Sequence, residues 1–198
     1  KNIISNLNKL AKDDSALPSI IAKNNNIDAE NVVFFSNEYN AAKKICDIFV
    51  PKYQDIITCN PPWNYLQLIS FENKLNLHYY VLKEDKNRKL SINYSSLKNK
   101  INAKTKLIYF SSPNIVSGQS IDIKTFKEII DNIPDNIIIL LDQRYYEFSN
   151  KKKNELLNGI DFIKKPNIIV LRSFNNYYSI ETLELSYIIT NKKLAPRT

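Results

Sequence analysis

Glycine is scarce in this chain of 198 residues. Only Gly118 and Gly159 are present, whereas about 7% glycine is typical of proteins. Loops that cradle phosphate need glycine, because a residue without a side chain lets backbone N–H groups approach the anion closely. The sequence contains neither a G-x-G-x-x-G motif nor a Walker A loop. These absences argue against nucleotide binding through a standard loop.

Cysteine and histidine are almost as rare. Cys46 and Cys59 have neither metal-ligand spacing nor a disulfide pattern, and both lie among apolar residues. We therefore expect buried free thiols in a reducing compartment. His78, the single histidine, lies inside an apolar run, which predicts a packed or edge residue rather than a catalyst. With so few ligands we expect no zinc or other metal site.

Long apolar runs are absent too. No run approaches the length of a membrane span, and the first residues lack the apolar core and cleavage site of a signal peptide. We therefore expect a chain without a membrane span. The sequence does not specify a location, and an intracellular, cytoplasmic one is the default. Methionine is missing even at position 1, which suggests that residues 1–198 are part of a longer product. A hydrophobic content of 43% is that of an ordinary globular protein.

The chain carries a net charge of +8. A basic protein attracts nucleic acid, so a nucleic-acid partner is one reading. However, Ile, Asn and Lys supply 80 of the 198 residues, and their codons are A/T-only or nearly so. The composition is therefore explained as well by an A/T-rich genome.

Short apolar runs alternate with amphipathic stretches along the chain. Runs rich in Ile and Val are typical of buried strands in a mainly parallel sheet. The predicted strands are Asn31–Phe35, Asp55–Cys59, Leu77–Leu82, Lys106–Ser111, Asn136–Asp142, Asn167–Phe174 and Leu183–Thr190. The predicted helices are Ala16–Lys23, Tyr39–Phe49, Trp63–Asn73, Tyr94–Lys100, Ile123–Asn132 and Lys151–Leu157. The charged stretch Lys83–Lys89 is interpreted as a turn.

Repeating strand–helix units predict an α/β fold, a three-layer α/β/α sandwich with a mainly parallel sheet. No internal repeat or long linker interrupts them, so we expect one domain. In an open sheet, ligands bind beyond the carboxyl ends of the strands. The segments expected to converge there are Phe35–Glu38, Pro61–Trp63, Asp142–Tyr145 and Ser173–Asn176.

Five segments carry recognisable motifs in order. Residues 31–39 stand where a known pattern has a strand followed by G-N-G-S-D, and residues 61–65 match its P-x-aromatic element. Residues 112–118 match N-P-N-N-P-T-G, and residues 142–145 (D-Q-R-Y) match D-E-A-Y. Residues 173–187 follow the frame S-F-S-K-x-x-G-L-x-G-x-R-x-G-Y. Together they resemble the class I and II aminotransferases that bind pyridoxal phosphate, and most of all the histidinol-phosphate aminotransferase branch.

This resemblance runs from about Asp13 to Asn191. It implies the fold of the family's large, cofactor-binding domain over residues 13–198, after an N-terminal segment of residues 1–12. The chain ends near Thr198, before the family's small C-terminal domain. That domain carries the arginine that binds the α-carboxylate of the substrate, so we expect no position for this arginine here.

Four matched positions keep chemically competent residues. The resemblance implies that Trp63 stands where an aromatic ring stacks on the pyridine ring of the cofactor. Asp142 stands where a carboxylate pairs with the pyridinium nitrogen. Tyr145 matches the donor to the phenolic oxygen, and Ser173 matches a phosphate-binding hydroxyl. We expect these four residues to be relics or packing residues.

Other matched positions have lost the family's residue. Asn176 stands at the Schiff-base lysine, and an amide cannot form an imine with an aldehyde. Glu184 replaces the arginine that clamps the phosphate, and Glu38 replaces a serine of the phosphate cup. Both carboxylates would repel a dianionic phosphate. Ile115 replaces the asparagine that binds the phenolic oxygen, and we expect Phe35 and Ile115 to narrow the pocket.

These losses predict a degenerate aminotransferase-like domain without transaminase activity, a pseudoenzyme that binds no cofactor. Such a domain would act as a structural or protein-interaction module and form homo- or hetero-oligomers through its large-domain surface. Two alternatives stay open. The first is an enzyme that binds pyridoxal phosphate without a covalent link. The second is a basic subunit of a nucleoprotein assembly.

Overall fold

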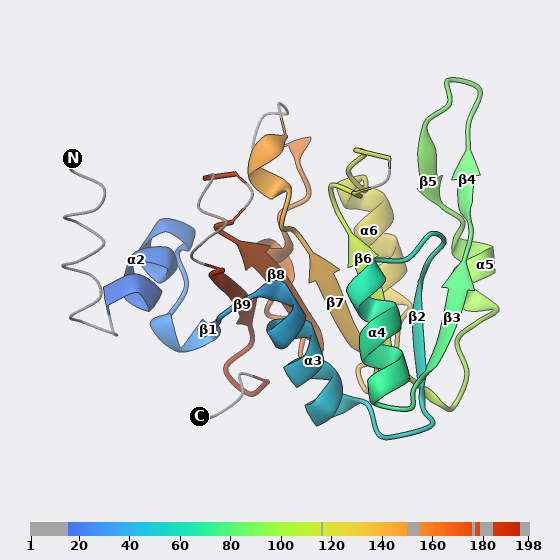
Figure 1. Cartoon of the computed structure of the whole chain (residues 1–198). Coiled ribbons are helices and arrows are strands. Elements are labelled where there is room, and N and C mark those ends of the chain that lie inside the picture. The colour runs from blue at the N-terminus through green and yellow to red at the C-terminus, as the bar shows by residue number, and fades with distance from the viewer. Residues whose placement is uncertain (1–15, 116, 150–154, 176, 179–183, 195–198) are drawn as a thin grey trace.

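A seven-stranded sheet forms the centre of the computed structural model, which describes residues 16–115, 117–149, 155–175, 177–178 and 184–194. The strand order is β1-β9-β8-β7-β6-β2-β3 (Figure 1). The strands are Val32–Phe35 (β1), Asp55–Cys59 (β2), Asn76–Tyr80 (β3), Thr105–Ser111 (β6), Ile138–Asp142 (β7), Ile168–Ser173 (β8) and Ser186–Thr190 (β9). A separate two-stranded sheet pairs Leu82–Glu84 (β4) with Leu90–Ile92 (β5).

Helices cover both faces of this sheet. The α-helices are Ala16–Asn25 (α2), Glu38–Phe49 (α3), Asn64–Glu72 (α4), Tyr94–Lys98 (α5) and Ile123–Asp131 (α6). Short 3₁₀ helices are Ala29–Asn31 (η1), Tyr146–Phe148 (η2) and Gly159–Phe162 (η4). Helices α3 and α4 lie in front of the sheet in Figure 1, and α5 and α6 lie behind it.

The sheet separates two apolar cores. Its central strands are buried on both faces, which explains their continuous Ile, Leu and Val runs. The core under α3 and α4 contains Ile45, Leu66 and Ile69, and the opposite core contains Phe126 from α6 and Leu97 from α5. This arrangement confirms the predicted α/β/α sandwich.

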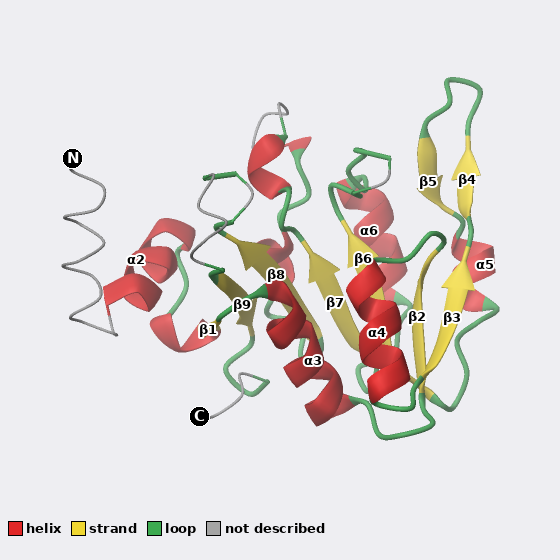
Figure 2. Cartoon of the chain, in the orientation of Figure 1, coloured by secondary structure: helices red, strands yellow, loops and turns green. Residues whose placement is uncertain are grey.

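Strand direction fixes where a site can form. Strands β8, β7, β6, β2 and β3 run parallel, and β9 is antiparallel to its neighbours β8 and β1. The carboxyl ends of the parallel strands therefore meet at one edge, as the arrowheads of β3, β7 and β8 show in Figure 2. Loops after β1, β2, β7 and β8 come together there, as expected for an open sheet.

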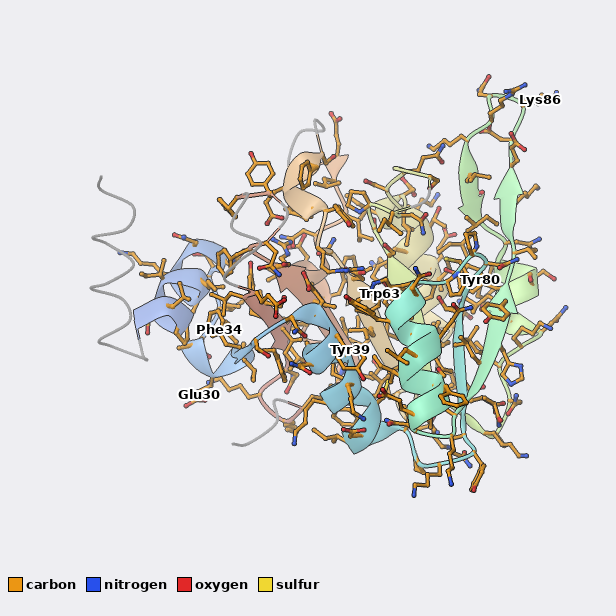
Figure 3. The ribbon with its side chains drawn as sticks, in the orientation of Figure 1. Glu30, Phe34, Tyr39, Trp63, Tyr80 and Lys86 are labelled. Carbon is orange, nitrogen blue, oxygen red and sulfur yellow. The ribbon has the colours of Figure 1, made fainter. Side chains whose placement is uncertain are left out.

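Two predicted elements differ from the structure. The segment Lys83–Lys89, interpreted as a turn, belongs to a small hairpin, because β4 and β5 pair on either side of Asp85. That hairpin projects beyond the main sheet, with Lys86 at its tip (Figure 3). Most of the predicted helix Lys151–Leu157 lies outside the described residues, and its described end, residues 155–157, is not α-helical.

The rare residues are placed much as expected. Cys46 and Cys59 are buried free thiols, and burial raises the pKa of both. His78 lies on β3, an edge strand of the sheet, with its Nε2 atom 3.3 Å from an Asp55 oxygen.

Over the part of the chain that the structure describes, there is no group of metal-ligating side chains and no helix fit to cross a membrane.

Candidate functional site

A hollow of about 440 Å³ opens at the carboxyl edge of the sheet. The starts of α3 and α4 form one side, and the segments after β7 and β8 form the other. Its walls include Glu38, Tyr39, Tyr65, Arg144, Tyr145 and Glu184. Figure 3 shows Trp63 beside the start of α4 and Tyr39 near the start of α3. Three of the four segments predicted to converge contribute to these walls, and the fourth, Pro61–Trp63, reaches the site through the contact of Trp63 with Arg144.

Arg144 and Asp142 form a buried ion pair beside this hollow. Arg144 Nε donates to Asp142 Oδ1 at 2.9 Å, and Arg144 Nη2 donates to Asp142 Oδ2 at 2.7 Å. The Arg144 backbone N–H donates to Oδ1 at 3.0 Å, and the Tyr109 hydroxyl donates to Oδ2. Asp142 is only 1% exposed. Its carboxylate is therefore fully occupied by partners within the protein.

The same guanidinium stacks on the single tryptophan. Arg144 Cζ lies 4.1 Å from the centroid of the Trp63 ring, a distance at which a cation is attracted to an aromatic face. Tyr109 is also stacked against Trp63, with ring centroids 5.9 Å apart and planes 17° apart. Arg144 lines the hollow, whereas Trp63 is not among its lining residues. The guanidinium, and not the indole, therefore forms this wall.

Arg144 is charged in this setting. Burial by itself lowers the pKa of its guanidinium, but the adjacent Asp142 carboxylate outweighs that effect and holds the pKa above its ordinary value. Tyr109 stays protonated, because burial and the neighbouring Asp142 carboxylate both raise the pKa of its hydroxyl. The site thus contains a cation and an anion that neutralise each other, with a neutral hydroxyl as a third partner.

Two carboxylates lie where the resemblance implies a phosphate cup. Glu38 is the first residue of α3 and is only 8% exposed. Its Oε1 atom accepts from Asn175 Nδ2 at 3.3 Å. Glu184 Oε2 accepts from Asn37 Nδ2 at 3.2 Å, and both glutamates line the hollow. This corner therefore presents negative charge to whatever enters.

The remaining candidate residues are dispersed. Tyr145 lines the hollow, whereas the buried Ser173 hydroxyl accepts the backbone N–H of Asn175 at 3.1 Å. Ile115 lines a second hollow of about 720 Å³ next to the loop after β6, and Phe35 packs against the core under α3 and α4. Neither Phe35 nor Ile115 lines the first hollow, so the expectation that they narrow it is wrong; Arg144 forms part of its wall instead.

Asn176 lies outside the described residues, so its environment stays a prediction. The main residue that the sequence analysis missed is Arg144. Its signal was present, since D-Q-R-Y at residues 142–145 has arginine where the D-E-A-Y motif has alanine. A large cation in place of a small apolar residue, two positions after a buried carboxylate, indicates an ion pair inside the site.

Pyridoxal phosphate, the cofactor implied by the resemblance, does not fit these residues. Its ring would need the face of Trp63 and the carboxylate of Asp142, and Arg144 makes both of those contacts. Its phosphate would need a cationic cup, and Glu38 and Glu184 are there instead.

Known proteins place this chain in one family. The family model described as aminotransferase class I and II matches residues 13–195. Histidinol-phosphate aminotransferase 2 of Hydrogenovibrio crunogenus is 33% identical over 84 residues, which are 42% of this chain and 22% of that protein. The enzyme of the same name from Carboxydothermus hydrogenoformans is 32% identical over 85 residues, 42% of this chain and 23% of the relative.

Solved structures agree on the fold. Histidinol-phosphate aminotransferase from Sinorhizobium meliloti, in complex with pyridoxal-5'-phosphate, matches with a TM-score of 0.80 and 16% identity. The match covers 90% of this chain and 47% of that one, so the chain spans about half the length of this relative. Together, the family model, the sheet order and the motifs show that the chain belongs to the class I and II aminotransferase family.

Proposed function

We propose that this chain is an aminotransferase-fold domain without transaminase activity, which acts as a structural or protein-interaction module. The observation that carries the proposal is the pair of carboxylates, Glu38 and Glu184, in the wall of one hollow. The frame that folding requires is kept, whereas the groups that would anchor a phosphate are replaced. Asn176, at the Schiff-base position, removes the covalent link as well.

Electrostatics supports this proposal. Two unit charges 4 Å apart near a protein surface interact with roughly 4 kcal/mol, and a dianionic phosphate would meet such repulsion from each glutamate. An arginine at position 184 would instead have offered bidentate, charge-assisted hydrogen bonds. Glu38 sits on the first turn of α3, where the helix dipole stabilises a negative charge. At this helix end the Asn37 side chain accepts the Asn40 backbone N–H at 2.9 Å, and the Glu38 carboxylate adds a negative charge where a phosphate would have to sit.

Cofactor binding tests the proposal directly. We expect millimolar pyridoxal phosphate to leave the melting temperature unchanged, because a ligand that binds only the native state must raise it. We also expect borohydride to fix no stoichiometric adduct in the site. A saturable rise in melting temperature without an adduct would support the alternative of non-covalent binding, and a stoichiometric adduct would overturn the proposal.

A pair of double variants tests whether Glu38 and Glu184 prevent anion binding. The double change Glu38→Ser and Glu184→Arg should make inorganic phosphate stabilise the protein, while the wild type shows no such effect. The matched double change Glu38→Gln and Glu184→Gln removes the repulsion without supplying a cation, so its response should be intermediate. Equal responses of all three proteins to phosphate would mean that the two carboxylates do not control anion binding.

Helix α4 offers the surface for the interaction role. Tyr65, Leu68 and Phe71 lie three residues apart on this helix and are exposed, Phe71 to 84%. Exposed apolar side chains grouped in this way are typical of protein–protein contacts. Figure 1 shows α4 on the outer side of the sheet, next to α3. We therefore place the contact surface of the module on α4.

Molar mass in solution tests this surface. We expect light scattering to give a particle of about twice the 23.0 kDa chain mass, in line with the two-fold dimers that are commonest among homo-oligomers. Phe71→Glu should return it to the monomer. Ile20→Glu, an exposed apolar residue of α2, is the matched control and should leave the dimer intact. A wild-type monomer, or a dimer that both changes leave unaffected, would contradict this assignment.

A further inference from the structure

We propose that Arg144 is a built-in substitute for the cofactor ring, holding together a site that relatives would fill with a ligand. This inference rests on the proposed function, because it concerns a domain that does not use pyridoxal phosphate. The guanidinium is flat and positively charged. It stacks on Trp63 through Cζ at 4.1 Å and forks onto Asp142 at 2.7 and 2.9 Å. These are the two contacts that a pyridinium ring would make there.

The chemistry of the guanidinium suits this role. A protonated ring offers one N–H to a carboxylate and a flat face to an aromatic side chain. An arginine side chain offers the same flat face and two parallel N–H groups, and it remains charged at any physiological pH. A lysine could supply the charge alone, without the fork or the face. The geometry therefore requires a planar cation and not merely a positive charge.

Removing the Arg144 side chain would leave the buried Asp142 carboxylate without its cationic partner. Asp142 is 1% exposed and Tyr109 is 2% exposed, so in a buried place the carboxylate would keep only two neutral donors, the Tyr109 hydroxyl and the backbone N–H of residue 144. Breaking a buried ion pair on one side is costly, because it leaves an uncompensated charge. Arg144→Ala should therefore lower the melting temperature by roughly 6–20 °C. The cavity that it leaves would have an aromatic wall and a buried anion, which together select a flat cation.

Chemical rescue of Arg144→Ala tests this selection. We expect methylguanidinium at millimolar concentration to raise the melting temperature of this variant saturably, while methylammonium, with equal charge but no planar fork, does not. Pyridoxamine should also stabilise the variant, because it carries a flat ring without a phosphate. Trp63 is the only tryptophan, so the fluorescence of the protein reports directly on the cavity left by Arg144. It should change over the same range of methylguanidinium concentration as the melting temperature.

Arg172 supplies the matched control. It is as buried as Arg144, stacks on Tyr146 with Cζ 3.8 Å from the ring, and pairs with Glu147 at 3.5 Å. It is not among the residues that line the hollow. Methylguanidinium added to Arg172→Ala should leave Trp63 fluorescence unchanged, and pyridoxamine should not stabilise this variant. A rescue by pyridoxamine of both variants alike would overturn the inference.

The inference can still be tested if Arg144→Ala does not fold without an added ligand. The variant is then refolded with methylguanidinium or with methylammonium, and recovery only with methylguanidinium supports the inference. Recovery with both, or with neither, overturns it. These results are separate from the fate of the proposed function. Binding of pyridoxal phosphate by the wild type would refute the proposed function. If the wild type does not bind it and Arg144→Ala is not rescued, only the role of Arg144 is refuted.

Discussion

At the scale of single residues, the two glycines have different reasons to be glycine. A Cβ atom on Gly159 would lie 2.7 Å from both Leu141 Cδ2 and Val170 Cγ2, which belong to the core strands β7 and β8. Gly118 has space around it, but its φ of +67° is a left-handed conformation that side chains disfavour. One position is limited by packing and the other by backbone strain.

Gly159→Ala should therefore destabilise the protein by about 1–3 kcal/mol, the usual cost of overpacking a core. Gly118→Ala is the matched control, and its strain should cost roughly 1 kcal/mol. Denaturant unfolding of both variants measures the two effects. Wild-type stability of Gly159→Ala would show that the Leu141 and Val170 side chains can shift to admit a methyl group.

Asp55 should make stability depend on pH. Burial alone raises the pKa of its carboxyl, but hydrogen bonds from Asn102 and Asn76 and the neighbouring His78 outweigh this and hold the pKa below 3.8. A carboxyl whose pKa is lowered in the folded state contributes stability above its unfolded pKa, and this contribution is lost as the pH falls through the folded pKa. The contribution of Asp55 is therefore complete at neutral pH and fades below about pH 4.

Asp55→Asn should cost roughly 1–3 kcal/mol at pH 7 and flatten the loss of stability in acid. Asp135→Asn is the control, since Asp135 pairs with Lys165 on the surface with 63% of its side chain exposed, where ion pairs contribute little. Unfolding free energies measured from about pH 6 to pH 2 test the difference. An acid limb of Asp55→Asn as steep as that of the wild type would contradict this account.

At the scale of elements, the stability of helix α6 depends on its N-cap residue, Asp122. Asp122 Oδ1 accepts the Thr125 backbone N–H at 2.9 Å, which satisfies one of the free donors at a helix start. Asp122→Ala should cost about 1 kcal/mol. Asp131→Ala, at the other end of α6, removes a negative charge from the unfavourable pole of the helix dipole and should be neutral or slightly stabilising. Equal effects of the two changes would argue against the cap.

Elements with a strong apolar pattern were predictable from sequence, and side-chain arrangements were not. Strand β2 was predicted to the residue, because Asp55–Cys59 is buried on both faces and bounded by polar residues. The β4–β5 hairpin was missed, because three-residue strands around a charged turn carry no periodicity. Arg144 was missed because the comparison of D-Q-R-Y with its motif considered only the first and last residues, Asp142 and Tyr145. The ion pair instead joins Asp142 to Arg144, two residues further along the turn.

At the scale of the whole molecule, the charge of +8 predicts only weak attraction to nucleic acid. Neutralising phosphates releases counterions, so such binding falls steeply as salt rises. We expect RNA to bind at about 50 mM salt and to dissociate by about 200 mM. Binding that persists at the higher concentration would favour the alternative of a nucleoprotein subunit, and titration with labelled RNA at both concentrations decides it.

For the whole molecule we propose that an aminotransferase fold has kept its frame, while Arg144 makes the contacts of the cofactor ring and two glutamates make the phosphate cup negative. The most direct test is a crystal structure of the protein grown with excess pyridoxal phosphate. We predict the Arg144 guanidinium on the face of Trp63, forked onto Asp142, with neither a ring nor a phosphate in the hollow lined by Glu38 and Glu184. A pyridine ring between Trp63 and a displaced Arg144 would contradict the account.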